Sequence, residues 1–268
     1  MTRHDWALHT HAGLSARLTR DSVGLLPLGA IEQHGPHLPL ATDQIIAEGL
    51  ANHAVEQCKS EHSIWLLPAV PVGQGLEHAA YAGTLSLSAA TFEAVVYELG
   101  ASAARAGLRR LVLFSGHGGN NAAMDNAALR LRHDHHMLVV KACYFDFPMP
   151  ATPTLPAREW REGLHGGALE TALMLYFNPE AVELQAAEHW PSMTSHALSD
   201  YTYLGAEQSA ARFAWLAGDL NPAGVVGDAR LASAAMGEAF AGHYAAILAD
   251  IIAEAARFPL ACLDTPKA

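Results

Sequence analysis

The first residues able to do chemistry follow an apolar run at residues 23–31, with the sequence VGLLPLGAI. Glu32 and His34 come next, and their spacing places both side chains on one side of an extended chain. Asp43 stands further along, at the predicted start of a helix, where a loop can return it to the same place. Two carboxylates and an imidazole suit a Zn, Mn or Fe ion, and the two oxygens of Asp43 can bridge two ions.

A structural explanation of this cluster is also open. Asp43 alone is well suited to cap the N-terminus of a helix, and His34 and His37 would then be polar loop residues. Charged groups directly after a buried strand are costly unless they are paired or bind a metal, which favours the metal site.

A second cluster, SGHGGN at residues 115–120, follows another apolar run. His117 is its strong metal ligand. Gly118 and Gly119 let the backbone approach a ligand closely, so we expect them to line a substrate pocket, and Asn120 is expected to cap the next helix. The alternative is a phosphate-binding turn, which the absence of GxGxxG and of a Walker lysine disfavours.

The third cluster is the stretch LHGGALET. Its Glu170 lies on an otherwise apolar helix, where desolvating a carboxylate is expensive and a metal ion would compensate. His165 precedes this helix and is expected to face the same cleft. The alternatives are a solvated stripe for Glu170 and an ordinary loop position for His165. In the glycine-rich segment 73–87, Glu77 and His78 either line the substrate pocket or lie on a surface loop.

Alternating apolar and helical patterns must position these clusters. We predict strands at residues 23–31, 63–70, 110–115 and 137–144, and helices at residues 43–54, 88–107, 121–133, 166–177 and 228–257. This alternation implies an α/β fold with a mainly parallel sheet and helices on both faces, with sites at the carboxyl ends of the strands. Residues 147–156 are expected to be irregular, residues 189–221 to be loop with short elements, and residues 221–228 to cap the last helix.

Composition limits the classes of function. The chain has 268 residues and a formal net charge of -11 without a basic run, which argues against nucleic-acid partners and anionic membrane surfaces. With 51% hydrophobic residues it is expected to fold, as one domain over residues 1–268. Cys58, Cys143 and Cys262 are widely spaced, which favours a reduced, cytoplasmic compartment. We find neither a signal peptide nor an apolar run of about 18–20 residues that would span a membrane.

The three clusters together resemble the signatures of the creatininase (creatinine amidohydrolase) family. LPLGAIEQHGPHLPLATD is similar to the opening signature, SGHGGN to the second signature, commonly NGHGGN, and LHGGALET to the HAGExET element. GLEHAAYAGTLSL and GVVGDARLA resemble two further blocks of the family. The resemblance runs in order from about Val23 to Gly237.

The resemblance implies a three-layer α/β/α sandwich, two divalent metal ions per chain and hydrolysis of a cyclic or linear small-molecule amide. Members hydrolyse creatinine or formamides, and one is a peptidase of cofactor maturation. By position, Glu32, His34, Asp43 and His117 are metal ligands, with Asp43 bridging, and Glu170 lies on or close to the metals. His165 matches a proposed proton carrier. The family also suggests a homo-oligomer, with a hexamer favoured.

Three positions depart from the family pattern. Creatininases carry a metal-binding Glu where this chain has Gly119, which makes Glu170 the natural replacement ligand and disfavours creatinine as substrate. Ala168 replaces the first carboxylate of HAGExET, and Ser115 replaces Asn. The predicted function is a metal-dependent amidohydrolase acting on a non-peptide or small amide C–N bond, with His165 and Glu170 in catalysis. The alternatives are a non-catalytic metal-binding or ligand-binding protein and a metal-dependent isomerase or lyase.

Overall fold

The centre of the protein is a five-stranded parallel sheet. A computed structural model describes residues 3–58, 63–198, 200–207 and 209–263. The strands follow the order β1-β3-β2-β4-β5, and each neighbouring pair runs parallel. Their bounds are β1 Arg3–Asp5, β2 Val23–Leu28, β3 Ile64–Leu66, β4 Arg110–Ser115 and β5 Leu138–Cys143. The predicted parallel sheet is confirmed, while β1 was not foreseen.

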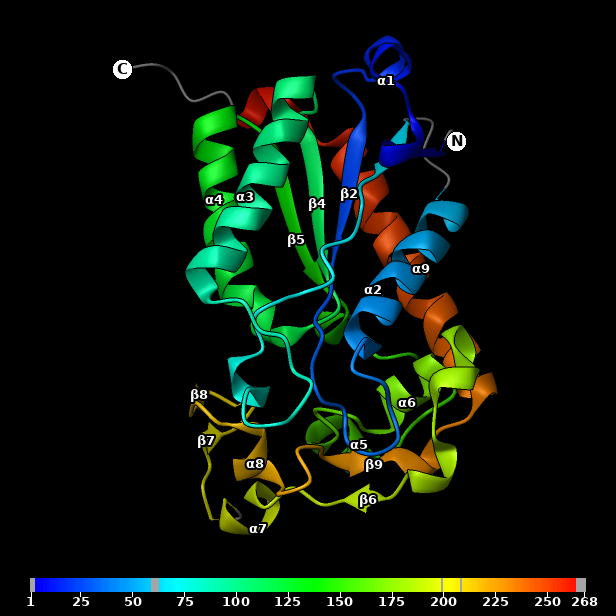
Figure 1. Ribbon diagram of the computed structural model, residues 1–268, viewed down its shortest axis with the longest axis vertical. Helices are drawn as coiled ribbons and strands as arrows, with labels where there is room; N and C mark the ends of the chain where they lie inside the picture. The colour runs from blue at the N-terminus through cyan, green and yellow to red at the C-terminus, as the bar shows by residue number, and fades with distance from the viewer. Residues whose placement is uncertain (1–2, 59–62, 199, 208, 264–268) are drawn as a thin grey trace.

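Helices cover both faces of this sheet (Figure 1). One face carries α2 (Thr42–Gln57), α6 (Ala168–Phe177) and α9 (Ala234–Arg257). The other carries α3 (Ala89–Ala106) and α4 (Asn121–His135). Alternate residues of β4 serve the two cores: Val112 and Phe114 pack with the first group of helices, and Leu111 and Leu113 with the second. This confirms the three-layer α/β/α sandwich.

The ends of α3 follow the predicted signals. Ser88 accepts a hydrogen bond from the backbone N–H of Thr91, and Gly107 closes the helix in the left-handed region with φ 115°. The prediction for the last helix is wrong at its start. Helix α9 begins at Ala234, after Ser233 accepts a hydrogen bond from Met236 N–H. Residues 221–228 therefore do not cap it.

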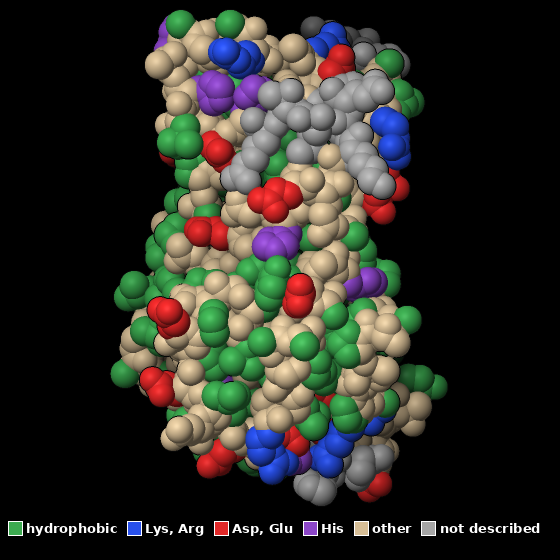
Figure 2. All heavy atoms as spheres, turned by 90° about the vertical axis from the view of Figure 1, so that its right-hand side faces the viewer, with side chains coloured by type: hydrophobic (Ala, Val, Ile, Leu, Met, Phe, Trp, Pro, Cys, Tyr) green, Lys and Arg blue, Asp and Glu red, His purple; other side chains and the backbone are tan. Residues whose placement is uncertain are grey.

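Helix α9 is long and apolar enough to cross a membrane by length and composition, with 50% of its apolar window buried inside the protein. Its buried side chains belong to the core on one face of the sheet, where α9 packs against α2 and α6. This packing is that of a core helix. On the face drawn in Figure 2, Lys and Arg side chains lie near the two ends of the molecule, with Asp, Glu and His scattered between them.

Short elements gather beyond the carboxyl ends of the strands, in the lower part of Figure 1. They are α5 Ala157–Glu162, α7 Thr194–Ala197, α8 Ala217–Leu220, the antiparallel pair β6 His189–Trp190 and β9 Gly227–Asp228, and the parallel pair β7 Leu204–Gly205 and β8 Ala211–Arg212. Helix α1 (His11–Arg17) lies at the opposite end. Leu28 and Ser115, the last residues of β2 and β4, are partners in register, so the segments that follow them leave the sheet at the same edge.

Candidate metal centre and cavity

Five predicted ligands converge at this edge of the sheet, and all are buried. Glu32 and His34 follow β2, His117 follows β4, and Asp43 and Glu170 lie in the first turns of α2 and α6. His34 Nε2 lies 3.2 Å from Asp43 Oδ1 and 3.8 Å from Glu170 Oε1. His117 Nδ1 lies 3.2 Å from Glu32 Oε1 and 3.3 Å from Asp43 Oδ2. The structure thus brings together all the residues expected to bind metal.

Asp43 is shared by two sets of three possible ligands. Glu32, Asp43 and His117 form one set, and His34, Asp43 and Glu170 form the other; the ligand atoms of each set lie within 4.8 Å of one another. Both oxygens of Glu32 and Oδ2 of Asp43 are buried without a hydrogen-bond partner among the described residues. Because uncompensated buried carboxylate oxygens are costly, the donor set fits a site for divalent cations.

The charges of the cluster are strongly coupled. Burial alone would lower the pKa of His117, but the Glu32 and Asp43 carboxylates raise it to about 10. Burial likewise opposes protonation of His34, yet Asp43 and Glu170 hold its pKa well above the ordinary value. Burial favours the neutral form of Asp43, but the two imidazoles lower its pKa. Burial raises the pKa of Glu32 well above its ordinary value, so without a metal the protons that balance the cluster are held on the imidazoles and on Glu32.

The turn after β4 orients His117. Its Nε2 lies 2.8 Å from the carbonyl oxygen of Gln74, which accepts the N–H and leaves Nδ1 free to face the cluster. The Ser115 hydroxyl closes the turn by donating to His117 O and accepting from His117 N. Asn120 was expected to cap α4, but its side chain makes no cap hydrogen bond. It donates instead to Gly29 O and accepts from Gln74 N, which joins three loops behind the site.

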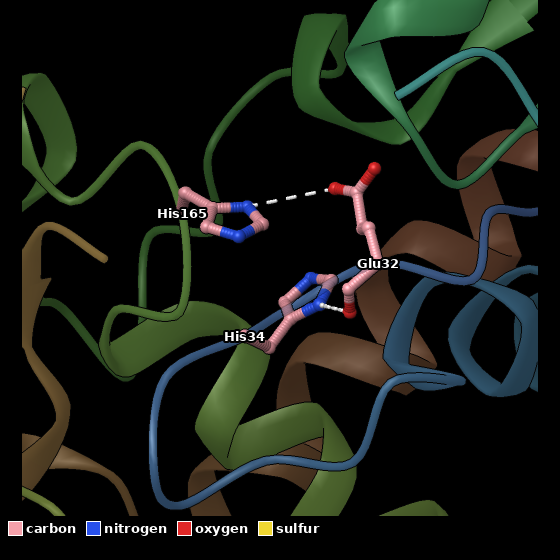
Figure 3. A group of neighbouring side chains, drawn as sticks. All are labelled: Glu32, His34 and His165. Atoms are coloured by element: carbon pink, nitrogen blue, oxygen red, sulfur yellow. Dashed lines mark hydrogen bonds and ion pairs between the residues drawn. The ribbon is translucent and has the colours of Figure 1, made fainter. Parts of the chain in front are cut away.

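His165 reaches the same cluster from the loop before α6 (Figure 3). Its Nε2 donates to Gln33 O at 2.7 Å, and its Nδ1 lies 3.8 Å from Glu32 Oε1. Burial and the charge of His34 lower the pKa of His165 to about 4. The ring is therefore neutral at neutral pH, with the unprotonated Nδ1 facing the carboxylate.

His78 lines the cavity, as expected, and also contacts the cluster. It is buried, its ring stacks on that of His165 with centroids 4.1 Å apart, and its Nε2 lies 3.3 Å from Glu32 Oε1. The amide nitrogen of Gln33 donates to its Nδ1 at 2.9 Å and to Gly224 O at 2.6 Å. Gln33, which the sequence analysis did not identify, therefore fixes one imidazole and also ties the segment before β9 to the site.

Two further side chains that the sequence analysis missed hold Glu170 and its loop. Tyr144 donates to Glu170 Oε1 at 3.4 Å, while Gly166 N–H donates to Oε2 at 2.6 Å. Glu159, a buried residue of α5, accepts from the backbone N–H groups of Ala168 and Asp228, each at 2.8 Å. The position of Tyr144 at the end of a predicted strand was a usable signal. No local pattern marked Glu159.

The cluster opens into a cavity of about 610 Å³. Glu77, Gly118 and Gly119 line it beside His117, as expected for a substrate pocket, and Glu77 Oε1 lies 3.5 Å from His117 Nε2. A Cβ at position 119 would lie 2.4 Å from His117 Nε2 and 2.6 Å from Gln74 O. The close approach of these two segments therefore requires glycine at position 119.

Comparisons with known proteins show the family of the chain. Residues 7–252 match the family model for creatininase, described as creatinine amidohydrolase. A mycofactocin precursor peptide peptidase of Mycolicibacterium smegmatis is 34% identical over 160 residues, 59% of each chain, so the alignment spans less than two thirds of that relative. A creatinine amidohydrolase of Pseudomonas putida is 30% identical over 65% of this chain and 71% of its own.

Solved structures share the fold. A crystal structure of creatinine amidohydrolase (creatininase) superposes with a TM-score of 0.77 and 25% identity, covering 94% of this chain and 98% of that one. Two further creatininase structures carry the names Creatininase Mn and Zn-Zn type.

The two hydrogen bonds that Glu159 accepts, called here the Glu159 clamp, can be tested by measuring the stability of the protein. Glu159→Ala leaves the N–H groups of Ala168 and Asp228 without their acceptor, so we expect a loss of roughly 2–3 kcal/mol in the free energy of unfolding, measured with urea. Arg161→Ala on the same helix is the control, because Arg161 is exposed and its loss should cost about 0.5 kcal/mol or less. Equal losses in the two variants would contradict the clamp.

The protonated imidazoles predict pH-dependent metal binding. A divalent ion takes the unprotonated nitrogen, so binding must displace protons from His34 and His117, whose pKa values are raised. Affinity for Mn²⁺ or Zn²⁺ should therefore increase from pH ~6 to pH ~8, with release of about one to two protons per chain. Calorimetry in buffers of different ionisation enthalpy measures this release. Binding without proton release, at an affinity independent of pH, would exclude the charge arrangement described above.

Proposed function

Because the chain belongs to the creatininase family, we propose that it is a metal-dependent amidohydrolase that cleaves a non-peptide or small amide C–N bond. The observation that carries this proposal is the pair of ligand sets that share Asp43 at the base of an open cavity. Glu32, Asp43 and His117 would hold one divalent ion, and His34, Asp43 and Glu170 the other. The donor set suits Zn, Mn or Fe.

The chain's own residues handle the proton. Divalent ions in such a site acidify water and polarise a carbonyl oxygen. His165 is neutral, and its unprotonated Nδ1 faces Glu32, so it is placed to accept a proton from the attacking water. It then carries that proton to the leaving nitrogen, and the Gln33 carbonyl keeps the ring in one tautomer throughout. Glu170 is held by Tyr144 and by Gly166 N–H, and acts as a ligand rather than a mobile acid.

The substrate is the finer part of the proposal. Gly119 leaves no room for the carboxylate that creatininases carry at that position, which disfavours creatinine. The relative from Mycolicibacterium smegmatis is called a peptidase, so a peptide amide is the second candidate. A homo-oligomer, with a hexamer favoured, and a cytoplasmic location stay predictions from the sequence.

Metal content and hydrolysis test the proposal together. We expect up to two Mn²⁺ or Zn²⁺ ions per chain after reconstitution, measured by elemental analysis, and hydrolysis of at least one member of a panel of amides, lactams and formamides. Asp43→Ala should lose both ions because both ligand sets include Asp43. Asp125→Ala, at an exposed carboxylate on α4, is the matched control and should keep both ions. Metal content unchanged by Asp43→Ala would refute the shared site, and bound metal without hydrolysis of any amide would favour the binding protein.

The role of His165 separates catalysis from metal binding. If it carries the proton, His165→Ala should lower kcat by about 10²-fold or more while KM and metal content stay nearly unchanged. If it is a ligand, the same variant should lose one ion, and added metal should partly restore the rate. His133→Ala, at an exposed position on α4, controls for the general loss of a histidine. Full activity in His165→Ala would leave proton transfer to another group.

A further inference from the structure

The cavity has a second wall that the metal chemistry does not use. Leu155, Trp160 and Leu169 line one part of it, and Phe213 and Trp215 line another. These side chains come from the segment around α5, the first turn of α6 and the segment after β8. Large apolar side chains that converge on a cavity at a polar catalytic cluster form the kind of surface that binds the apolar part of a ligand.

The volume of the cavity points the same way. At about 610 Å³ it lies within the range of roughly 300–1,000 Å³ in which pockets enclose drug-sized ligands. Formamide or a simple lactam would fill only the end beside the metal cluster. Phe145 and Met149 extend the wall toward solvent, where 38% and 59% of their surfaces are exposed. Without a ligand, this apolar surface stays in contact with water.

The charges of the lining disfavour an anionic group at the far end, because Asp146, Glu159 and Glu207 also line the cavity. Arg212 is the only lysine or arginine among the described residues that line the cavity, and its guanidinium lies 3.6 Å from the Glu207 carboxylate. Both side chains are largely exposed, so they lie in a solvated rim. The half-buried rings of Trp160, Phe213 and Trp215 lie in the same lining.

The position of His165 indicates which side of the amide meets this wall. Trp160, Leu164 and Leu169 flank His165 along the chain and line the cavity with it. If His165 delivers the proton to the leaving nitrogen, the substituent on that nitrogen lies against these three side chains. The acyl side then faces Glu77 and the glycines after β4, where the cavity is polar.

We propose that the substrate is an amide that carries a bulky apolar group, preferably an aromatic ring, on its nitrogen. This inference rests on the proposed amide hydrolysis and names the substrate class of the same site. The amine released would carry the ring, and the acyl group would be small and polar. The metal cluster selects the bond, and the apolar wall selects the leaving group.

Two isomeric amides test the proposal. N-Benzylacetamide carries the ring on the nitrogen side, and its isomer N-methyl-2-phenylacetamide carries it on the acyl side. N-Methylacetamide, which has no ring, is the parent of both. With reconstituted protein, we expect kcat/KM to be about 10-fold or more higher for N-benzylacetamide than for the other two. Phe213→Ala and Trp215→Ala should remove most of this advantage, so that the ratio of kcat/KM for N-benzylacetamide to kcat/KM for N-methylacetamide falls toward one.

Matched variants separate the wall from general stability. Tyr203 is 71% exposed, lies beside β7 and is outside the cavity lining. Tyr203→Ala should therefore leave kcat/KM unchanged for both isomers. Trp215→Phe keeps a ring and should retain much of the preference for N-benzylacetamide. If an alanine variant fails to fold, the ratio of kcat/KM for the two isomers in the unmodified protein still tests the proposal. Equal rates for the isomers, or a preference for the acyl-side ring, would overturn the proposal.

Calorimetry separates this inference from the proposed function. If no amide is hydrolysed but N-benzylacetamide binds more tightly than its isomer, and Trp215→Ala abolishes the difference, the apolar wall stands and the proposed function fails. If N-methylacetamide is hydrolysed but N-benzylacetamide neither binds nor reacts better, the proposed function stands and the apolar wall is not a leaving-group site.

Discussion

The structure depends on the burial of three carboxylates and two imidazoles around Asp43. Asp43 is only 1% exposed to solvent. One of its carboxylate oxygens contacts His34, and the other contacts His117. Each of these charges would be costly alone in such a place, and only their mutual proximity, or a cation among them, makes the arrangement stable. The fold must therefore bring four separate segments to one point with little tolerance, and the parallel order of β2 and β4 achieves this by ending both strands at the same edge.

Close contacts between backbone segments also fix the positions of the ligands. A Cβ at Gly116 would lie 2.6 Å from Asp43 O, so the turn after β4 touches the first turn of α2 directly. Gly119 allows the same closeness to Gln74, whose carbonyl then orients His117. Around this centre, Asn120 and Gln33 use side-chain amides to join loops that are distant in the sequence. Hydrogen bonds from neighbouring groups thus orient the ligand side chains, as they do in metal sites generally.

The sequence predicted the parts of this arrangement that have local causes. Strands such as β4 follow from apolar runs, α3 from its serine and glycine ends, and the ligands from their places after strands. Glu159 and Gln33 could not be recognised, because each acts through partners far along the chain. Asn120 has the composition of a cap, but its tertiary partners Gly29 and Gln74 take its hydrogen bonds. For the same reason residues 221–228 join the His165 loop, where Val226 N–H donates to His165 O, instead of capping α9.

The metal cluster and the apolar wall are built from different parts of the chain. Glu32 and His117 belong to the edge of the sheet and Asp43 to the first turn of α2, where burial and the charge balance tolerate little change. Phe213 and Trp215 line the cavity from the segment between β8 and α8. Substitutions in that segment can alter the shape that a substrate meets without moving a ligand. His165 and Glu170 lie on the loop before α6 and in its first turn, and Glu159 accepts hydrogen bonds from Ala168 N–H and Asp228 N–H. If the apolar wall binds the leaving group as proposed, a change of leaving group requires new side chains on the wall, whereas a change of reaction requires different residues at the edge of the sheet.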